Sequence, residues 1–453
     1  GLLSNHGTTL ATFSAAGRVK RALLDCGFAV HKKKGYGRKR EMITANWQKK
    51  TPVLPKEYQT PWYSDIAPIH SEKHALIIGA GLAGCFTAYA LSRRGWTVSL
   101  IDAEGTLGAG ASGNRQAVLY PRLSAFSSPY TDFMLHAFLF AARTYQSLQQ
   151  TCKLGELNGI LQLAHNPKEK AAQANLKAFL KYYPQLGVLV DKQAASQLAG
   201  VPVLTEGLFV PMAGWMDSFA LCRYLLSASN IHEIIHADID EIGYDKGYWH
   251  AGSNHANALV LANGLGSNQL SQTCHLPLKP IRGQLSAIQA TKESMRIKIP
   301  LCAQGHVLPS RDGSHLTGAT YHLGIASCQA DDWDDEENLR KLHQLPLATK
   351  WSDNITNHWC NVRMATPDYL PLVGPVPKAQ ELIERFASLA DNAKRWIASP
   401  GAYYPGLYIC SGFGSRGLTS IPLSTEILAK RMNGEPIPAA TNLVKSLAPA
   451  RFL

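Results

Sequence analysis

The sequence predicts a mixed fold of the α/β (α+β) class with more than one lobe, and three observations lead to this prediction. The chain has 453 residues, which exceeds the length of a typical single domain. Apolar residues make up 45% and charged residues 17%, with 37 Gly and 25 Pro. This composition supports a packed core and excludes disordered, coiled-coil and collagen-like chains. From His74 onward, strand-like and helix-like segments mix without an internal repeat.

The first 45 residues predict a helix over 15–26 and strands around 28–33 and 40–44, with the turn residues Gly35-Tyr36-Gly37 forming a hairpin. A segment of this size cannot bury a useful core alone, so residues 1–45 must dock on another part or be the remnant of a larger domain. Residues 46–73 carry four prolines and little apolar periodicity, which is typical of a linker.

Residues 74–102 have the pattern of a strand, a glycine turn, a helix and a second strand. A buried strand over 74–78 leads into the G-x-G-x-x-G motif at 79–84. The helix is predicted over 85–94 and the second strand over 97–101, ending at Asp102. This order is typical of the βαβ unit that binds a dinucleotide. The alternative interpretation is a glycine-rich core turn.

Each glycine of the motif has a physical task. Gly79 permits the tight turn, Gly81 lets backbone amides approach a pyrophosphate, and Gly84 allows the helix and strand to pack closely. Asp102 is placed to accept hydrogen bonds from a ribose, with Glu104 as the substitute if the strand ends later. An acid at this position argues against a 2′-phosphate, but it does not separate NAD from FAD.

Charge and cysteine usage limit the class of protein further. The net charge is +12 (45 − 33) and the pI is about 9.2, which suits either a polyanionic partner or ordinary solubility charge. The nine cysteines are odd in number, scattered and without a C-x-x-C motif. They predict a reducing compartment, no disulfide framework and no metal site.

The sequence gives no sign of a leader or a membrane span. The chain begins at Gly1 without a basic region ahead of an apolar core, so no signal peptide is expected. The uncharged run 75–91 has 17 residues, fewer than the roughly 20 that a span needs, and glycines interrupt it. A soluble, cytoplasmic protein is therefore expected.

Glycine-rich segments recur along the rest of the chain, at 110–116, 259–267, 280–284, 318–322, 362–375 and 406–418. Taken singly, each is compatible with an ordinary turn. In order and spacing they resemble the flavin-dependent oxidases of the D-amino-acid oxidase, glycine oxidase and sarcosine oxidase group. The resemblance covers about residues 74–440. It implies FAD, held without a covalent bond, and makes 74–453 one oxidoreductase domain.

The same resemblance implies a fold of two lobes. A Rossmann-like dinucleotide-binding lobe for FAD is expected at about 74–130, 205–280 and 360–440. A substrate lobe built on an antiparallel sheet is expected at about 131–204 and 281–359. Cys360 and Cys410 lie near segments expected to contact the flavin, and both are interpreted as core thiols.

Two further sets of motifs resemble one branch of that group. Residues 113–116, 119–121, 318–322 and 414–417 look like the FAD-dependent half of the bifunctional tRNA enzymes that make 5-methylaminomethyl-2-thiouridine. Residues 7–17, 27–28 and 34–42 resemble the closing segment of the class I methyltransferase half of those enzymes. The chain lacks the S-adenosylmethionine loop, so it is expected to be a fragment in which methyl transfer requires the intact protein.

This branch implies a specific reaction on tRNA. The substrate would be 5-carboxymethylaminomethyluridine, 2-thiolated or not, at wobble position 34, and the products would be glyoxylate and 5-aminomethyluridine. In the intact protein, methylation that uses S-adenosylmethionine would follow. One alternative is a small-molecule oxidase acting on glycine, sarcosine or proline. Another is a non-catalytic RNA-binding module that keeps a flavin as structural filler.

The substrate carboxylate calls for an arginine, whose planar fork binds carboxylate through two parallel hydrogen bonds. Arg363 is the first candidate, because it lies in the segment that presents this arginine in related oxidases; an ion pair between lobes is the alternative. Arg416 is a candidate for balancing flavin charge or clamping the substrate. Tyr321 is a candidate donor to the carboxylate or a packed strand residue. Arg282 follows a strand and is compatible with a purely structural role.

The candidate FAD-binding residues are positions at which the backbone or a polar side chain would contact the cofactor. They are Gly79, Gly81, Gly84, Asp102, Ser112, Asn114, Arg115, Gln116, Gly264, Gly412, Gly414, Ser415 and Gly417.

A cluster of cations in the N-terminal hairpin is the candidate tRNA contact. It consists of Lys32, Lys33, Lys34, Arg38, Lys39 and Arg40, around the aromatic Tyr36. Such a cluster suits phosphates and predicts a salt-dependent affinity. A solvated hairpin is the alternative.

Overall fold

A computed structural model of the chain describes residues 7–48, 62, 72–229, 231–393, 395, 397 and 399–453. It divides into two compact units. The first comprises Gly1–Ile66 and Glu381–Ala402, and the second Ala67–Gln380 and Tyr403–Leu453. Most of the predicted linker over 46–73 lies outside the described residues.

The N-terminal part of the first unit is a three-stranded antiparallel sheet with one helix. Its elements are β1 Thr9–Thr12, α1 Gly17–Asp25, β2 Phe28–Lys34 and β3 Glu41–Trp47, in the sheet order β1-β3-β2. Phe28, Ile43 and Ala45 are its buried apolar residues, and the Phe28 ring meets the edge of Trp47. The predicted helix and hairpin are confirmed. The sequence did not indicate β1, because this short strand pairs with a strand about thirty residues away.

The second unit contains a six-stranded sheet that is parallel except at one edge. Its order is β12-β5-β4-β16-β24-β23, and only β23 runs antiparallel to its neighbour. The bounds are β4 His74–Ile78, β5 Thr97–Asp102, β12 Ile231–His236, β16 Ala258–Leu261, β23 Leu372–Pro377 and β24 Tyr403–Ser411. The strands predicted over 74–78 and 97–101 are confirmed.

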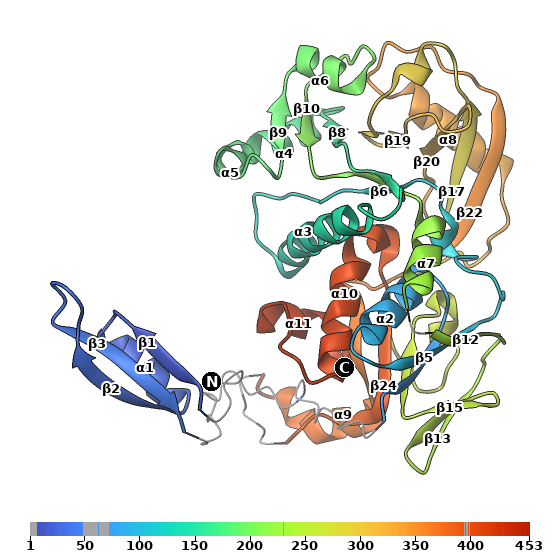
Figure 1. The fold of residues 1–453 in the computed structure, drawn as a ribbon. Coiled ribbons are helices and arrows are strands. Elements are labelled where there is room, and N and C mark those ends of the chain that lie inside the picture. The colour runs from blue at the N-terminus through green and yellow to red at the C-terminus, as the bar shows by residue number, and fades with distance from the viewer. Residues whose placement is uncertain are drawn as a thin grey trace. The chain divides into compact units, whose positions relative to one another are not determined.

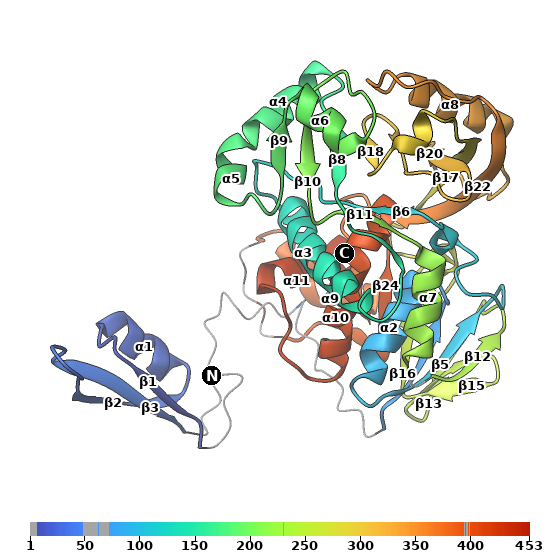
Figure 2. The same ribbon diagram turned by 45° about the horizontal axis from the view of Figure 1, so that its top comes forward.

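Each face of this sheet is covered, as parallel strands require. Leu76 and Ile78 belong to a core with Trp249 of the meander β13-β14-β15, whereas Ile77 faces α2. Figures 1 and 2 show α10 between α2 and α3, with α7 beside α2. The bounds are α2 Leu82–Ser92, α3 Pro129–Leu148, α7 Ser218–Ser227, α10 Gly417–Met432, β13 Ile242–Asp245, β14 Tyr248–Ala251 and β15 Asn254–Ala256.

A larger, mostly antiparallel sheet of nine strands forms the other lobe of this unit. Its order is β21-β17-β20-β19-β18-β8-β10-β9, with β22 on the remaining edge of β17. The bounds are β8 Ile160–Leu163, β9 Val188–Val190, β10 Gly207–Val210, β17 Lys279–Gln289, β18 Leu301–Cys302, β19 His306–Val307, β20 Ser314–Gly318, β21 His322–Leu323 and β22 Ile355–Ala365. An apolar core between the sheet and its helices includes Ala195 of α6 and Leu342 of α8.

The remaining described elements connect these layers. They are β6 Ala117–Leu119, β7 Gly155–Glu156, β11 Gly214–Met216, α4 Pro167–Asn175, α5 Lys177–Tyr182, α6 Lys192–Ala199, α8 Asp332–His343, α9 Ala379–Phe386, α11 Thr441–Leu447 and the short 3-10 turns η2 Ala111–Gly113, η3 Gly264–Asn268, η4 Ser294–Arg296, η5 Ala387–Leu389, η6 Gly414–Arg416 and η7 Pro449–Phe452. Among the helices of the described ranges, none combines the length and the apolar character that crossing a membrane requires.

The lobe boundaries expected from the sequence remain a proposal. The pairing of the strands and the packing of one helix suggest different bounds for three segments. Strand β10 is hydrogen bonded to β8 and β9, and β22 is hydrogen bonded to β17 along its whole length. Helix α3 packs against α10. We therefore assign 207–210 and 355–365 to the substrate lobe and 129–148 to the FAD lobe.

Candidate functional site

A cavity of about 1010 Å³ lies between the two sheets of the second unit. On one side it is lined by the carboxyl ends of β4, β5 and β16, including Gly79, Asp102 and Ala262. Gly283 and Arg363 of the paired strands β17 and β22 line the other side. In open α/β sheets, ligands bind outside the carboxyl ends of the strands, so this is the candidate site.

The glycine turn brings backbone, rather than side chains, to the cavity. Gly79 has φ +105°, and a Cβ there would lie 2.5 Å from the Ala262 carbonyl oxygen. A Cβ on Gly84 would collide with the Gly79 carbonyl, and Gly84 does not line the cavity. Gly81 precedes α2, whose first N–H, on Leu82, donates to Ser112 Oγ at 2.8 Å. The positive φ of Gly79 agrees with the tight turn predicted there, and the contact at Gly84 agrees with the predicted close packing, whereas cofactor binding by this turn stays a prediction.

The Asp102 carboxylate stabilises the glycine turn through hydrogen bonds. Its Oδ2 accepts from the Ala80 N–H at 2.6 Å, and its Oδ1 accepts from the Glu104 N–H at 3.0 Å. Both Asp102 and Glu104 line the cavity. Because the Asp102 carboxylate already receives two backbone donors, Glu104 is the acid with more hydrogen-bonding capacity left for a ribose.

The segment after β5 contributes only part of its predicted set. Ser112 and Asn114 line the cavity, whereas Arg115 and Gln116 do not. The Arg115 guanidinium lies over the Phe219 ring at 4.1 Å. Gln116 is buried, and its Nε2 donates to the Pro309 carbonyl at 3.2 Å. The side chains of Arg115 and Gln116 therefore contact other protein groups and do not line the cavity.

The remaining side of the cavity is formed mainly by residues that follow β16 and β24. Gly264, Gly412, Gly414, Ser415 and Gly417 all line the cavity, as does the Cys410 thiol. Burial raises the pKa of Cys410 to about 12, so this thiol stays protonated and unreactive.

Arg363 presents a buried guanidinium nitrogen at the cavity. Burial lowers the pKa of its guanidinium, and its Nη2 is buried without a hydrogen-bond partner among the described residues. Buried charged donors that lack a partner are costly, so this fork is well suited to receive an anion. The exposed Tyr321 also lines the cavity, with the Arg363 guanidinium 5.9 Å from the centre of its ring.

Arg416 is placed differently from Arg363. Its Nη2 donates to the Tyr120 hydroxyl at 2.8 Å, and its guanidinium lies 4.2 Å from the centre of that ring. Tyr120 lines the cavity and Arg416 does not. Arg416 is therefore linked to the cavity wall through Tyr120.

Sequence reasoning missed several titratable residues that also line the cavity, among them His306 of β19, and Glu337 and Lys341 of α8. Burial, followed by the charges of Arg363 and Lys341, lowers the pKa of His306 to about 4. No local motif marks these residues, because each comes from an element brought to the cavity by pairing or packing. Arg282, by contrast, has the structural role considered for it: it is buried in an ion pair with Asp334.

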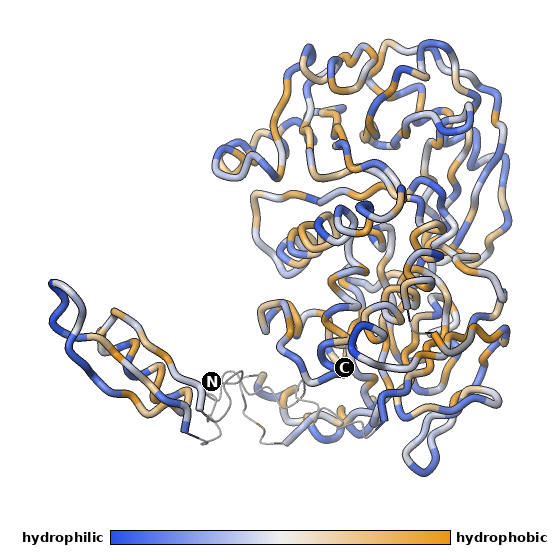
Figure 3. The backbone as a smooth tube through the Cα atoms, in the orientation of Figure 1, coloured by the Kyte–Doolittle hydropathy of each residue, from blue (hydrophilic) through white to orange (hydrophobic). Residues whose placement is uncertain are grey.

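The six predicted cations of the N-terminal hairpin are all exposed, on β2 and in the turn before β3. Lys32 Nζ lies 2.6 Å from Glu41 Oε2, and Lys39 Nζ lies 5.2 Å from the centre of the Phe13 ring. The side chain at the turn, Tyr36, is 96% exposed. In Figure 3 the tip of this hairpin is hydrophilic.

Comparison with known families gives two matches. The sequence model of the FAD dependent oxidoreductase family matches residues 74–431. That of an S-adenosyl-L-methionine-dependent methyltransferase family matches residues 2–48.

Curated relatives match along the whole chain. The tRNA 5-methylaminomethyl-2-thiouridine biosynthesis bifunctional protein of Legionella pneumophila strain Philadelphia 1 is 45% identical over 452 residues, covering 100% of this chain and 68% of that protein. The protein of the same name from Chromobacterium violaceum is 37% identical over 463 residues, covering 100% of this chain and 70% of its own length.

Solved structures share the fold of the second unit. Glycine oxidase from Geobacillus kaustophilus has a TM-score of 0.66 at 17% identity, covering 84% of this chain and 98% of that one. Iminodiacetate oxidase from Chelativorans sp. has a TM-score of 0.65 at 20% identity, covering 83% and 98%.

Proposed function

The chain belongs to the FAD dependent oxidoreductase family and, within it, to the tRNA 5-methylaminomethyl-2-thiouridine biosynthesis bifunctional proteins, and from this premise we propose its reaction. It oxidatively removes the carboxymethyl group, as glyoxylate, from 5-carboxymethylaminomethyluridine, 2-thiolated or not, at the wobble position of tRNA. The product is 5-aminomethyluridine. Methylation would follow in a protein that carries the rest of the methyltransferase domain.

The buried guanidinium of Arg363 is the observation that carries this proposal. The side chain of the proposed substrate is an N-substituted glycine, which ends in a carboxylate. Arg363 lines the cavity with an Nη2 that has no partner among the described residues. A guanidinium binds a carboxylate through two parallel hydrogen bonds, which fixes both position and orientation. Tyr321, beside this guanidinium, is proposed as a further donor to the carboxylate.

The residues of the other wall fit FAD. The glycine turn and the start of α2 line the cavity, where a helix N-terminus suits a pyrophosphate, and Glu104 and Asp102 offer acceptors for a ribose. Ser112, Asn114, Gly264 and the turn at 412–417 would complete the pocket. We propose that Gly84, Arg115 and Gln116 support this wall without facing the cavity. FAD, when bound, supplies the acceptor for two electrons from the substrate.

The proposed reaction consumes one water molecule. Oxidation of the bond between the amine nitrogen and the glycine α-carbon gives a substrate imine, and water then splits it into glyoxylate and the primary amine. The oxidation needs a neutral amine nitrogen. We propose that the amine is bound neutral, in which case the oxidation requires no general base. Arg416 is proposed as a positioning residue that holds Tyr120 at the wall.

The N-terminal hairpin is proposed as a tRNA contact. The relatives that share the whole chain are named for their part in tRNA modification. Five of the six exposed hairpin cations have no carboxylate partner within the described residues; Lys32 is paired with Glu41. Exposed cations bind phosphates with an affinity that falls as salt rises.

The test is bleaching of the flavin's visible absorption in the absence of oxygen. One sample receives tRNA that carries the carboxymethylaminomethyl group, and others receive unmodified tRNA, glycine or sarcosine. Bleaching by the modified tRNA alone, with glyoxylate formed, is the expected result. Bleaching by the free amino acids but not by the tRNA would instead establish a small-molecule oxidase, the function suggested by the fold shared with glycine oxidase.

A further inference from the structure

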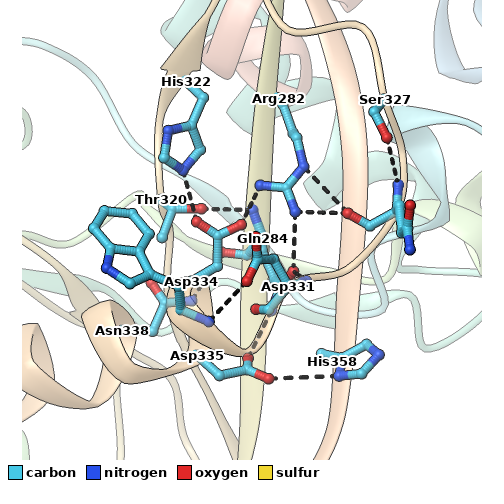
Figure 4. A network of polar contacts seen from close by, with 12 residues as sticks. Arg282, Gln284, Thr320, His322, Ser327, Asp331, Asp334, Asp335, Asn338 and His358 are labelled. Atoms are coloured by element: carbon cyan, nitrogen blue, oxygen red, sulfur yellow. Dashed lines mark hydrogen bonds and ion pairs between the residues drawn. The ribbon is translucent and has the colours of Figure 1, made fainter.

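Helix α8 is held against the large sheet by polar contacts in addition to the apolar packing of Leu342. Asp334 forms an ion pair with Arg282 of β17 and also accepts from His322 Nε2 at 2.6 Å, as Figure 4 shows. Although burial acts to raise it, the pKa of Asp334 is lowered by the hydrogen bonds from His322 and Arg282. The carboxylate therefore stays charged and both of its oxygens are engaged. The ligand atoms of His322, Asp334 and Glu337 lie within 4.8 Å of one another, and the first two are hydrogen bonded to each other.

A second set of contacts continues along the same helix. Asp335 Oδ1 accepts from Gln284 Nε2 at 2.8 Å and from Ser286 Oγ at 2.5 Å, and its other oxygen faces His358 (Figure 4). One turn later, Asn338 Nδ2 donates to the Gln284 carbonyl at 3.0 Å. Buried polar groups that are paired in this way hold one arrangement of the helix on the sheet.

This arrangement fixes Lys341 at the edge of the cavity. Its stem packs on Gly305, where a Cβ would lie 3.2 Å from Lys341 Cβ. Its Nζ donates to the Ala319 carbonyl at 3.1 Å and lies 2.6 Å from Glu337 Oε1. The exposed fraction of the two side chains is 9% for Lys341 and 20% for Glu337. A fixed cation and a fixed carboxylate therefore stand side by side, and both line the cavity.

The Lys341–Glu337 pair lies close to the carboxylate-binding end of the same cavity. Lys341 Nζ donates to the Ala319 carbonyl, and the carbonyl oxygen of the next residue, Thr320, would lie 2.8 Å from a Cβ on Gly283, in the space that Arg363 Nη2 occupies. Arg363 comes from β22 and Lys341 from α8, so the two cations approach from different elements. A substrate whose carboxylate is bound by Arg363 would extend its remaining part past this pair.

We propose that Glu337 and Lys341 recognise the edge of the uracil base, with Glu337 accepting from N3–H and Lys341 donating to O4. This inference rests on the proposed function, because it assumes a uridine substrate. The ammonium of Lys341 has three donors, of which Glu337 and Ala319 use two. The Glu337 carboxylate, which has four lone-pair sites, is paired with Lys341 alone among its recorded partners in the described part of the chain.

The chemistry of the base fits the pair. A uracil edge presents an acceptor at position 4 and a donor at position 3, which are neighbouring atoms. Nζ and Oε1, 2.6 Å apart, offer a donor and an acceptor at a similar spacing. Cytosine has a donor at position 4 and an acceptor at position 3, so each of its groups would face a like group of the pair. The pair would accept uracil and reject cytosine.

The test combines one change in the protein with one change in the base. The full chain with FAD is given anticodon stem–loops whose wobble nucleotide is either 5-carboxymethylaminomethyluridine or its N3-methyl derivative, and kcat/KM is measured from flavin reduction. Glu337→Met keeps the length of the side chain and removes the acceptor. Glu336→Met, at an exposed neighbour on α8 that does not line the cavity, is the matched control. Retained FAD and the thermal unfolding temperature confirm that each variant is folded.

The wild-type chain and Glu336→Met should prefer the unmethylated base by about tenfold or more, the value of a hydrogen bond to a charged group. In Glu337→Met this preference should fall to near unity. The inference is overturned if Glu337→Met keeps the wild-type preference, or if the wild-type chain shows none while both stem–loops reduce the flavin. If neither stem–loop nor the modified tRNA reduces the flavin, the proposed function itself is rejected.

Discussion

The guanidinium of Arg363 lies in the space that a side chain at position 283 would fill. A Cβ on Gly283 would overlap Arg363 Nη2 and would lie 2.8 Å from the Thr320 carbonyl oxygen. Strands β17 and β22 pair with Ile281 opposite Arg363, so the Arg363 side chain reaches along its partner strand to the glycine. The absence of a side chain at 283 is thus what allows a buried arginine to face the cavity.

Arg363→Ala should reduce kcat/KM with the modified tRNA by at least about a hundredfold, because two charge-assisted hydrogen bonds to the substrate carboxylate are lost. FAD should be retained, since Arg363 lies on the wall opposite the glycine turn. Flavin reduction and the visible spectrum measure the two effects. Arg340→Ala, at an exposed position of α8, is the control. Unchanged turnover in Arg363→Ala would remove this residue from the anchor role.

Gly283→Ala should impair the same step without removing the arginine. The added methyl group displaces Arg363 and presses on the Thr320 backbone, so we expect a loss of about 1–3 kcal/mol in stability and a marked fall in kcat/KM. Gly243→Ala is the control, because a Cβ there meets no heavy atom within 4 Å. Urea unfolding and flavin reduction measure both effects. Wild-type kinetics in Gly283→Ala would show that the position of Arg363 is not critical.

Asp102 and Glu104 should respond differently to loss of charge. Asp102→Asn weakens two backbone hydrogen bonds, so the protein without FAD should lose about 1 kcal/mol of unfolding free energy and also bind FAD less well. Glu104→Gln should weaken FAD binding with little change in that stability. Equilibrium unfolding of the apoprotein and fluorescence titration with FAD separate the two. Equal stability in both variants would contradict the scaffold role of Asp102.

The folded state should lose stability in mild acid through His306. Its pKa falls from 6.5 to about 4 on folding, so below pH 6.5 the unfolded chain binds the proton more readily. Stability from this group is complete above about pH 6.5 and is lost as the pH falls to about 4, by on the order of 3 kcal/mol. His306→Gln should flatten the pH dependence of the unfolding free energy in that window. A slope equal to that of the wild type would show that other groups cause it.

The hairpin cations should contribute to tRNA affinity through charge. Replacing Lys33 and Arg38 by Ala should weaken binding and reduce the slope of log affinity against log salt by about two, or one per phosphate contact. Lys168→Ala with Lys246→Ala, at exposed positions of the second unit, is the matched control. Filter binding at several salt concentrations gives both quantities. Equal slopes for the two double variants would favour a solvated hairpin.

The sequence by itself determined the features that depend on neighbouring residues. The glycine turn and its flanking strands fall within thirty residues, and their spacing alone predicts where Gly79 and Gly84 must lack side chains. The hairpin of residues 28–47 follows from its turn and its alternation in the same way. Short-range sterics and backbone hydrogen bonds decide such elements, so a local pattern is sufficient.

Only the tertiary structure decided which charged groups meet at the cavity. Arg363, the first candidate for the carboxylate anchor, lines it, whereas Arg416, a candidate for balancing flavin charge or clamping the substrate, does not. His306, Glu337 and Lys341 come from a two-residue strand and a helix, positioned by pairing and packing with distant segments. Side chains alternate in direction along a strand, so a shift of one residue in register would turn His306 of β19 or Arg363 of β22 away, whereas Glu337 and Lys341 depend on how α8 packs. That register is set by contacts between segments far apart in the chain, and no local pattern contains it.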